Sequence, residues 1–175
     1  EDENLARQAR LIGSLLIGQA IGAGVFFVLF IAVWFLEPDL PLGVLLLAPL
    51  LAGLACPLAY WLIHSQRLTL AGYALLISVL LSATGGMYAL GGFRGPAPLV
   101  YLWPIVVAGM LIEPRASFAF STLATFLYLG FAIMEWMGLY TPIVHIGTAK
   151  LDYVTIGATS LMFHLLAFLT WLSAK

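Results

Sequence analysis

Long apolar segments alternate along the chain with short breaks that are polar or rich in glycine and proline. A helix that crosses a membrane needs about 20 apolar residues, and we predict six such segments. They are residues 11–36, 44–64, 70–90, 97–112, 116–137 and 153–172. The fourth segment is the shortest, and Pro96 and Pro98 fix its start. No apolar–polar alternation runs long enough for the strands of a membrane barrel, so we expect an all-α bundle of six transmembrane helices forming one membrane domain over residues 1–175.

Composition supports a membrane protein and excludes several other classes. The chain is 63% hydrophobic and 9% charged, and a soluble domain of this size cannot hide so much apolar surface. The net charge of −1 is scattered, which argues against a nucleic-acid partner. The single cysteine, Cys56, excludes an internal disulfide and a cysteine-based metal cluster.

The distribution of basic residues predicts the orientation, because short cytoplasmic loops are enriched in Lys and Arg. With a cytoplasmic N-terminus, the inner side holds five basic residues and the outer side two. The inner set is Arg7, Arg10, Arg67, Arg115 and Lys175, and the outer set is Arg94 and Lys150. We therefore predict that both termini are cytoplasmic. The opening "EDENLARQAR" lacks an initiating Met and a signal-peptide pattern, so we expect the chain to belong to a longer protein.

Small residues at every fourth position mark the first segment. Ser14, Gly18 and Gly22 share one helix face, and such spacing lets helix backbones approach closely in lipid. Two interpretations are open: packing within the chain, or a seam between two copies of it.

Polar residues inside apolar segments are costly in a bilayer, so each needs a reason. Glu135 is expected near the outer end of the fifth segment, either at the interface or as a partner of Arg94 or a ligand headgroup. His164 falls near mid-membrane, either hydrogen-bonded to a neighbouring helix or anchoring a ligand. Gln19 is most simply a hydrogen-bonding link between helices. We predict no metal site, because no two histidines are spaced for shared coordination.

The junction between the third and fourth segments, "GGFRGPAPLVYLWPIVVAGML", is the candidate ligand site. Its glycines remove side-chain volume, and Pro104 takes a backbone donor from the fourth segment and is expected to bend it. Flat side chains with polar tips suit a lipid-like or quinone-like ring. The predicted ligand-binding residues are Tyr88, Gly91, Gly92, Arg94, Pro96, Tyr101, Trp103, Pro104 and Glu135.

This junction resembles that of the six-helix membrane regions of bacterial sensor histidine kinases. The likeness is to the kinases that control pilin genes and, more loosely, to redox-sensing kinases. Matching positions at the junction are Gly91, Gly92, Pro96, Tyr101, Pro104 and Ile105, and Leu127, Tyr128, Glu135 and Gly138 match on the fifth segment. Gly95 and Ala97 stand where the families have Ser or Asn and Phe. The resemblance implies a multi-pass protein of the bacterial cytoplasmic membrane.

The function we predict is a sensory module that couples an outer-leaflet ligand, a quinone or a lipid, to movement of the sixth helix. No phosphoacceptor histidine is present, since the residues after His64, His145 and His164 are not acidic. We therefore expect a non-enzymatic input region whose kinase domain lies outside this chain. Two alternatives stay open: a cofactor-, lipid- or quinone-binding subunit of a larger membrane complex, and a small transporter subunit. The expected partners are the bilayer and a homodimer or larger assembly.

Overall fold

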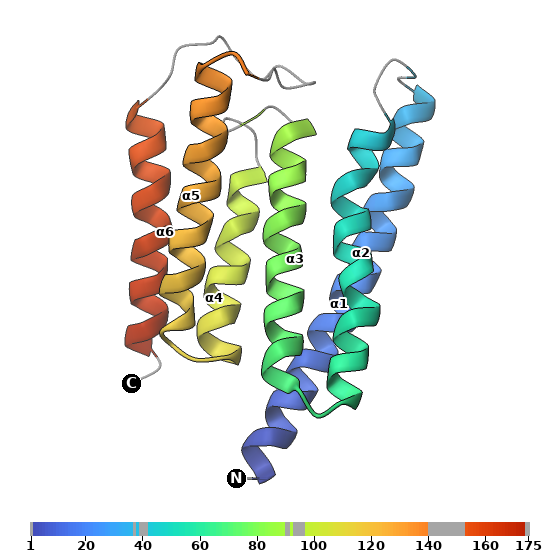
Figure 1. Ribbon diagram of the computed structural model, residues 1–175, viewed down its shortest axis with the longest axis vertical. Helices are drawn as coiled ribbons and strands as arrows, with labels where there is room; N and C mark the ends of the chain where they lie inside the picture. The colour runs from blue at the N-terminus through green and yellow to red at the C-terminus, as the bar shows by residue number, and fades with distance from the viewer. Residues whose placement is uncertain are drawn as a thin grey trace. The chain divides into compact units, whose positions relative to one another are not determined.

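In the computed structural model, residues 2–36, 38, 42–89, 92, 97–139 and 153–173 are described, and all the regular structure among them is helical. The helices follow one another along the chain and are labelled in Figure 1. They are α1 (Asp2–Leu36), α2 (Leu42–His64), α3 (Leu68–Ala89), the 3₁₀ helix η2 (Ala97–Tyr101), α4 (Leu102–Leu111), α5 (Ala116–Trp136) and α6 (Tyr153–Ser173). The predicted all-α fold is confirmed.

Five helices of the described part are long and apolar enough to cross a membrane, where six spans were predicted. The exception is the fourth segment, whose apolar helical stretch is Pro98–Leu111. With 3₁₀ geometry in η2 and α geometry in α4, the two together extend about 25 Å. The hydrocarbon core is about 30 Å thick. The prolines that set the start of this segment also keep it short.

Helix α1 begins nine residues before the predicted span, at Asp2 rather than at residue 11. The added residues are mostly good helix formers, including Leu, Ala, Arg and Gln. At 1.5 Å per residue the whole helix extends about 52 Å. It is therefore longer than a bilayer core is thick.

The helices divide between two compact units, residues Glu1–Ser82 and Ala83–Lys175. We call them unit 1 and unit 2 and describe each by itself. The boundary falls within α3, between Ser82 and Ala83.

In unit 1, α1 packs along α2. A Cβ added at Gly53 would lie 3.9 Å from the Cβ of Ala23, so these two small residues mark the close approach of the helices. Helix α2 contains Pro49 and Pro57, each of which removes a backbone donor from the helix. A membrane helix tolerates such losses where neighbouring groups satisfy the freed carbonyls.

In unit 2, α4 packs against both α5 and α6. Gly109 lies where they meet, because a Cβ added there would be 2.5 Å from Thr170 Cγ2 and 3.2 Å from Ser117 Cβ. The Ser117 hydroxyl donates to the Pro114 carbonyl at 2.7 Å and lies 3.3 Å from the Ala167 carbonyl of α6. Unit 2 is thus built on a close crossing at which only glycine fits.

Candidate functional site at the start of α4

The start of α4 is a change of helix type. Helix η2 ends at Tyr101 and α4 begins at Leu102, so Pro104 occupies the first turn of α4. A first-turn residue has no helical partner for its N–H, so proline fits there without breaking a hydrogen bond. The expected bend around Pro104 is therefore realised as a 3₁₀-to-α transition, with Pro104 itself buried.

Tyr101 lies in the core of unit 2. Its side chain is 0% exposed, and its hydroxyl is 2.7 Å from Thr84 Oγ1 of α3, where either group can donate the hydrogen bond. Its ring meets Phe163 of α6 edge-on, with centroids 5.8 Å apart and planes at 80°. Tyr101 therefore connects η2 to both α3 and α6.

Phe163 completes an aromatic cluster with a second tyrosine. Tyr128 of α5 also approaches it edge-on, with centroids 6.1 Å apart and planes at 75°. All three rings are fully buried, and edge-to-face contacts of this kind stabilise aromatic pairs beyond the area they bury. We call Tyr101, Tyr128 and Phe163 the aromatic cluster.

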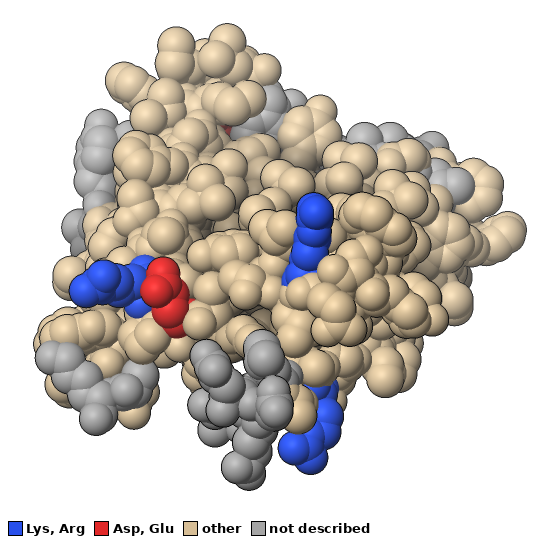
Figure 2. All heavy atoms as spheres, turned by 60° about the horizontal axis from the view of Figure 1, so that its bottom comes forward, with Lys and Arg blue, Asp and Glu red and all other residues tan. Residues whose placement is uncertain are grey.

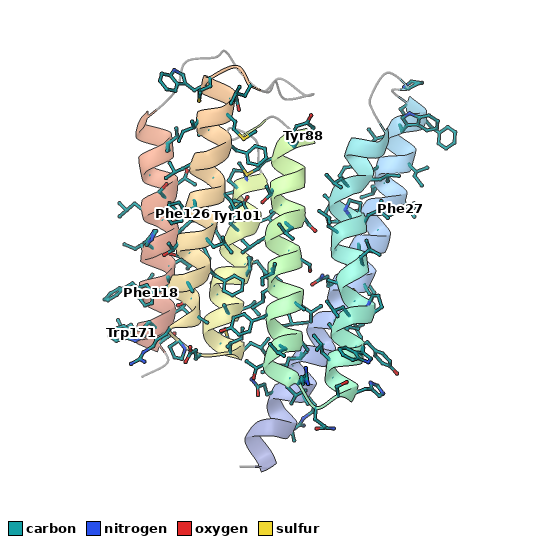
Figure 3. The ribbon with its side chains drawn as sticks, viewed as in Figure 1. Phe27, Tyr88, Tyr101, Phe118, Phe126 and Trp171 are labelled. Carbon is teal, nitrogen blue, oxygen red and sulfur yellow. The ribbon has the colours of Figure 1, made fainter. Side chains whose placement is uncertain are left out.

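The three predicted aromatic ligand contacts do not share one environment. Tyr88 on α3 and Trp103 on α4 are 39% and 41% exposed, whereas Tyr101 is 0% exposed. Figure 3 shows that Tyr88 and Tyr101 come from different elements of the bundle. The prediction that Tyr101 lines an open cavity is corrected: its ring and hydroxyl are already engaged by protein groups.

Gly92 is the residue of the preceding loop that the structure describes. It is buried and its φ is +65°, in the left-handed region that side chains disfavour. The backbone conformation at this position therefore favours glycine. Gly91, Arg94 and Pro96, and with them the predicted Arg94–Glu135 pair, lie outside the described residues.

Glu135 lies half-buried in the last turn of α5. Gly138, at φ +69°, ends this helix. The N–H of Leu139 donates to the Met134 carbonyl at 2.9 Å, and that of Gly138 to the Glu135 carbonyl at 3.1 Å. This Schellman motif puts the carboxylate near the negative end of the helix dipole, which favours cations instead. The placement is electrostatically unfavourable for the helix, and this makes Glu135 a candidate for contacts with a cationic or hydrogen-donating group.

His164 does not join two helices. It is exposed on α6, and its Nδ1 lies 3.0 Å from the carbonyl of Ser160 in the same helix. Because a carbonyl only accepts, Nδ1 is the protonated nitrogen of this contact. Of the two interpretations of His164, the hydrogen bond to a neighbouring helix is not found among the described residues, and the ligand anchor stays a prediction.

Gln19 does link helices, as predicted. Its Nε2 donates to the Ala52 carbonyl of α2 at 2.9 Å and to Ser78 Oγ of α3 at 2.7 Å. The Ser78 hydroxyl donates in turn to the Leu75 carbonyl at 2.7 Å. The other amide atom, Oε1, is buried without a partner among the described residues.

Gly18 and Gly22 are not the packing glycines of unit 1. A Cβ added at either would meet no described atom within 4 Å. Packing within the chain, one of the two interpretations of this small-residue face, does not depend on them. The other, a seam between two copies, stays a prediction.

Several residues of the site were not anticipated from the sequence. Thr84 and Phe163 gave no signal in an apolar chain, and Tyr128 was noted only through the family resemblance. Gly109 is one of 17 glycines and has no distinguishing neighbours in the sequence. Tyr101 and Thr84 could have been identified as a hydrogen-bonded pair only if the sequence showed how deeply each side chain is buried.

Comparison of the chain with known protein families, with curated proteins and with solved structures gave no match.

Proposed function

We propose that this chain is a membrane sensory module in which a ligand at the α3–α4 loop is coupled to movement of α6. The observation that supports it is the position of Tyr101. This residue ends the 3₁₀ helix that follows the loop, and its ring packs against Phe163 of α6. A shift of η2 would therefore change the contact of Tyr101 with Phe163 and so act directly on α6.

Close packing supports transmission along this route. Packed interiors respond to a displaced side chain by repacking rather than by gradual deformation. Phe163 meets Tyr101 on η2 and Tyr128 on α5, so it cannot follow one ring without changing its contact with the other. The bond to Thr84 holds the hydroxyl of Tyr101, so the ring has a defined resting position.

The proposed ligand is amphiphilic, either a lipid or a quinone. Tyr88 and Trp103 offer half-exposed aromatic faces beside the same loop. Rings with polar tips suit molecules that combine an apolar ring or chain with a polar head. The half-buried carboxylate of Glu135 at the end of α5 is the proposed partner for a hydrogen-donating head.

Gln19 and His164, the two polar residues that suggested a transporter, no longer support that alternative. In unit 1, Gln19 is tied to α2 and α3 by two hydrogen bonds. In unit 2, His164 is exposed and donates to its own helix. Both have structural roles that need no transported solute. The alternative of a cofactor- or lipid-binding subunit shares the same site and is distinguished by whether α6 moves.

The coupling can be tested without knowing the ligand. The protein would carry Cys56→Ser and an environment-sensitive fluorophore on Ser173→Cys, an exposed position at the end of α6. Gly92→Leu strains the loop, and in this experiment that strain substitutes for the effect of a bound ligand. We expect it to change the emission of the fluorophore, and Phe163→Ala to abolish that change.

Phe168→Ala provides the matched control, because Phe168 lies on the same helix but is 48% exposed. It should leave the response to Gly92→Leu intact. A response that survives Phe163→Ala unchanged, or no response to Gly92→Leu in a folded protein, would show that the loop is not coupled to α6. Adding decylubiquinone, or exchanging phosphatidylcholine for phosphatidylglycerol, to the parent protein then identifies the ligand class.

We further propose that η2 and α4 together make a short sixth crossing, that both termini are therefore cytoplasmic, and that the membrane is the bacterial cytoplasmic membrane. The charge distribution of the sequence supports this orientation. In intact cells of a Cys56→Ser background, a membrane-impermeant thiol reagent should label a cysteine at Asp39 and spare one at Arg67. The reverse pattern would invert the topology, and labelling of both would contradict α2 as a span.

A further inference from the structure

One end of unit 1 gathers basic and aromatic side chains from α1, from α2 and from the turn between α2 and α3. The hydrogen bonds of Gln19 set the register, since they place it level with Ala52 of α2 and Ser78 of α3. Counting nine residues along each helix toward the start of α1 places Arg10 level with Trp61 and Thr69. The fully buried Ile12, Ala59 and Ala71 follow the same register two residues further in, which supports it.

The turn between α2 and α3 lies at this level and has a fixed shape. Gln66 has φ +59°. The N–H of Arg67 donates to the Leu62 carbonyl at 2.9 Å, and that of Gln66 to the Ile63 carbonyl at 3.0 Å. This is the hydrogen-bond pattern of a Schellman motif. Arg67 belongs to this turn, and its side chain is exposed.

His64 presents its outer nitrogen at the same end. Its ring lies 4.3 Å from that of Tyr60, and its Nδ1 is 3.2 Å from the Tyr60 carbonyl. Nδ1 is thus the donor to the backbone, and Nε2 is left for other partners. We call Arg10, Trp61, His64, Arg67 and Thr69 the basic end of unit 1.

The basic end lacks acidic neighbours. In the sequence, no Asp or Glu occurs from Asn4 to Leu36 or from Leu40 to Ile112. Among the described residues, neither Arg10 nor Arg67 forms an ion pair, and Arg10 Nε donates only to the Ala6 carbonyl at 3.4 Å. Glu3 lies seven residues before Arg10, about 10 Å further along the helix axis. On the face drawn in Figure 2, one group of basic atoms touches acidic atoms, and the other basic atoms touch no acidic atoms that the figure draws.

The location of this end is set by the helices that it connects. Both α2 and α3 are long and apolar enough to span a membrane, so the turn between them lies at a membrane surface. Tyr60 and Trp61 are 57% and 58% exposed, and aromatic side chains of this kind favour the headgroup level. The arginines therefore lie at the depth of lipid phosphates.

We propose that the basic end of unit 1 is a binding site for the phosphate of an anionic phospholipid. Arg10 and Arg67 supply guanidinium groups that can bind phosphate oxygens in pairs, while their aliphatic stems lie along the apolar helix surface. His64 and Thr69 supply further hydrogen-bonding groups at the edge of the site. The occupant is a lipid of the surrounding bilayer, whose acyl chains would lie against the exposed apolar side chains of α1 and α2. This site is separate from the α3–α4 loop and does not depend on the proposed sensory function.

The test measures the lipid preference of the whole chain in detergent by native mass spectrometry, with phosphatidylglycerol and phosphatidylcholine as probes. We expect the parent protein to retain phosphatidylglycerol preferentially. Because a basic residue near an anionic surface contributes to binding through its charge, each arginine lost should weaken that preference about fivefold. The Arg10→Ala, Arg67→Ala double variant should therefore lose most of it.

Arg115→Ala is the matched control. It removes the same charge from an exposed position in unit 2, two residues after Glu113. It should keep the preference of the parent, and an equal loss would show that overall charge, not this site, attracts the lipid. Arg10→Lys with Arg67→Lys retains the charge and should keep part of the preference, which separates loss of charge from misfolding.

Two further outcomes would overturn the assignment. The first is an unchanged preference in the double alanine variant that retains the helicity of the parent. The second is loss of the preference in the parent when inorganic phosphate is added, since the site would then hold free phosphate and not lipid. Retention of the preference in phosphate, together with its loss in the double variant, supports the lipid site.

Discussion

In unit 1, the first helix keeps most of its side chains outside the core, whereas in unit 2 the side chains of α5 and α6 close around the start of α4. Among the described side chains of α1, only Ile12 is fully buried. In unit 2, the aromatic cluster and Gly109 bring three helices into close contact. In unit 1 the amide of Gln19 hydrogen-bonds to two other helices, whereas unit 2 is joined mainly by side chains packed around Gly109 and within the aromatic cluster.

The difference shows two ways to hold apolar helices together in lipid. The hydrophobic effect gives little preference for helix–helix over helix–lipid contact, because lipid chains are as apolar as leucine. What remains is hydrogen bonding and close van der Waals packing. Unit 1 places a hydrogen-bonded amide between its helices besides the close approach of Ala23 and Gly53, whereas unit 2 relies more on close packing along α4. The two units should therefore respond differently to the same kinds of substitution.

The largest expected effect is on Phe163. Phe163→Ala would leave a cavity at the centre of the aromatic cluster and should destabilise unit 2 by about 3 kcal/mol. The measurement is SDS-induced unfolding in mixed micelles. Phe168→Ala, at an exposed position of the same helix, should cost less than about 0.5 kcal/mol. Equal costs would mean that the cluster adds nothing beyond burial in lipid.

The next largest effect is expected for Gly109→Ala, which should destabilise unit 2 by about 2 kcal/mol. The added Cβ would lie 2.5 Å from Thr170 Cγ2 and would overlap it. Gly130→Ala in α5 is the control, since a Cβ there would meet no described atom within 4 Å. It should be neutral or slightly stabilising, because alanine favours the helix. The same unfolding measurement compares the two. A tolerated Gly109→Ala would show that the α4–α6 crossing can open without cost.

Gln19→Leu should cost about 1 kcal/mol or less. It removes two interhelical hydrogen bonds, but it also removes the buried and unpartnered Oε1. Hydrogen bonds between membrane helices average only about 0.6 kcal/mol. The double variant with Ser78→Ala should reveal a coupling energy of that size, and Ser14→Ala, at an exposed position of α1, should change nothing. A loss above about 2 kcal/mol would mean that unit 1 depends on this amide far more than the comparison implies.

The smallest effect is expected for Tyr101→Phe, which removes the hydroxyl bond to Thr84 and keeps the ring. It leaves the Thr84 hydroxyl without this partner, so the cost should be about 0.5 kcal/mol, the lower end of what one hydrogen bond contributes. Thr84→Val should give a similar value, and the double variant should cost less than the sum. Fully additive costs would show that the two hydroxyls do not interact.

Much of the fold follows from hydropathy alone. The starts and ends of α2, α3, α5 and α6 fall within about two residues of the predicted segments, because apolar length and flanking polar residues decide them. Two features did not follow. Helix α1 continues past the apolar segment into residues that favour helix, and prolines shorten the fourth segment below the length of a span.

The candidate site was only partly predictable, for a reason specific to membranes. A helix in water reveals its buried face by the alternation of apolar and polar residues. In lipid both faces are apolar, so Phe163 at 0% exposure and Phe168 at 48% look alike in the sequence. Gln19 was identified because a polar side chain at depth must find a partner. Tyr88, Tyr101 and Trp103 were grouped by proximity in sequence, and their different depths could not be read from it.

Because α1 is long, a small tilt of the helix displaces its start. No proline interrupts the helix between Asp2 and Leu36, and we take Gln19, which is bonded to two neighbouring helices, as its pivot. From that pivot to Asp2 the helix extends about 26 Å. A tilt of about 5° around Gln19 would therefore sweep the start of the helix sideways by about 2 Å, while side chains near the pivot hardly move. Small angular changes within the bilayer are thus converted into displacements outside it that are large enough to make or break a hydrogen bond.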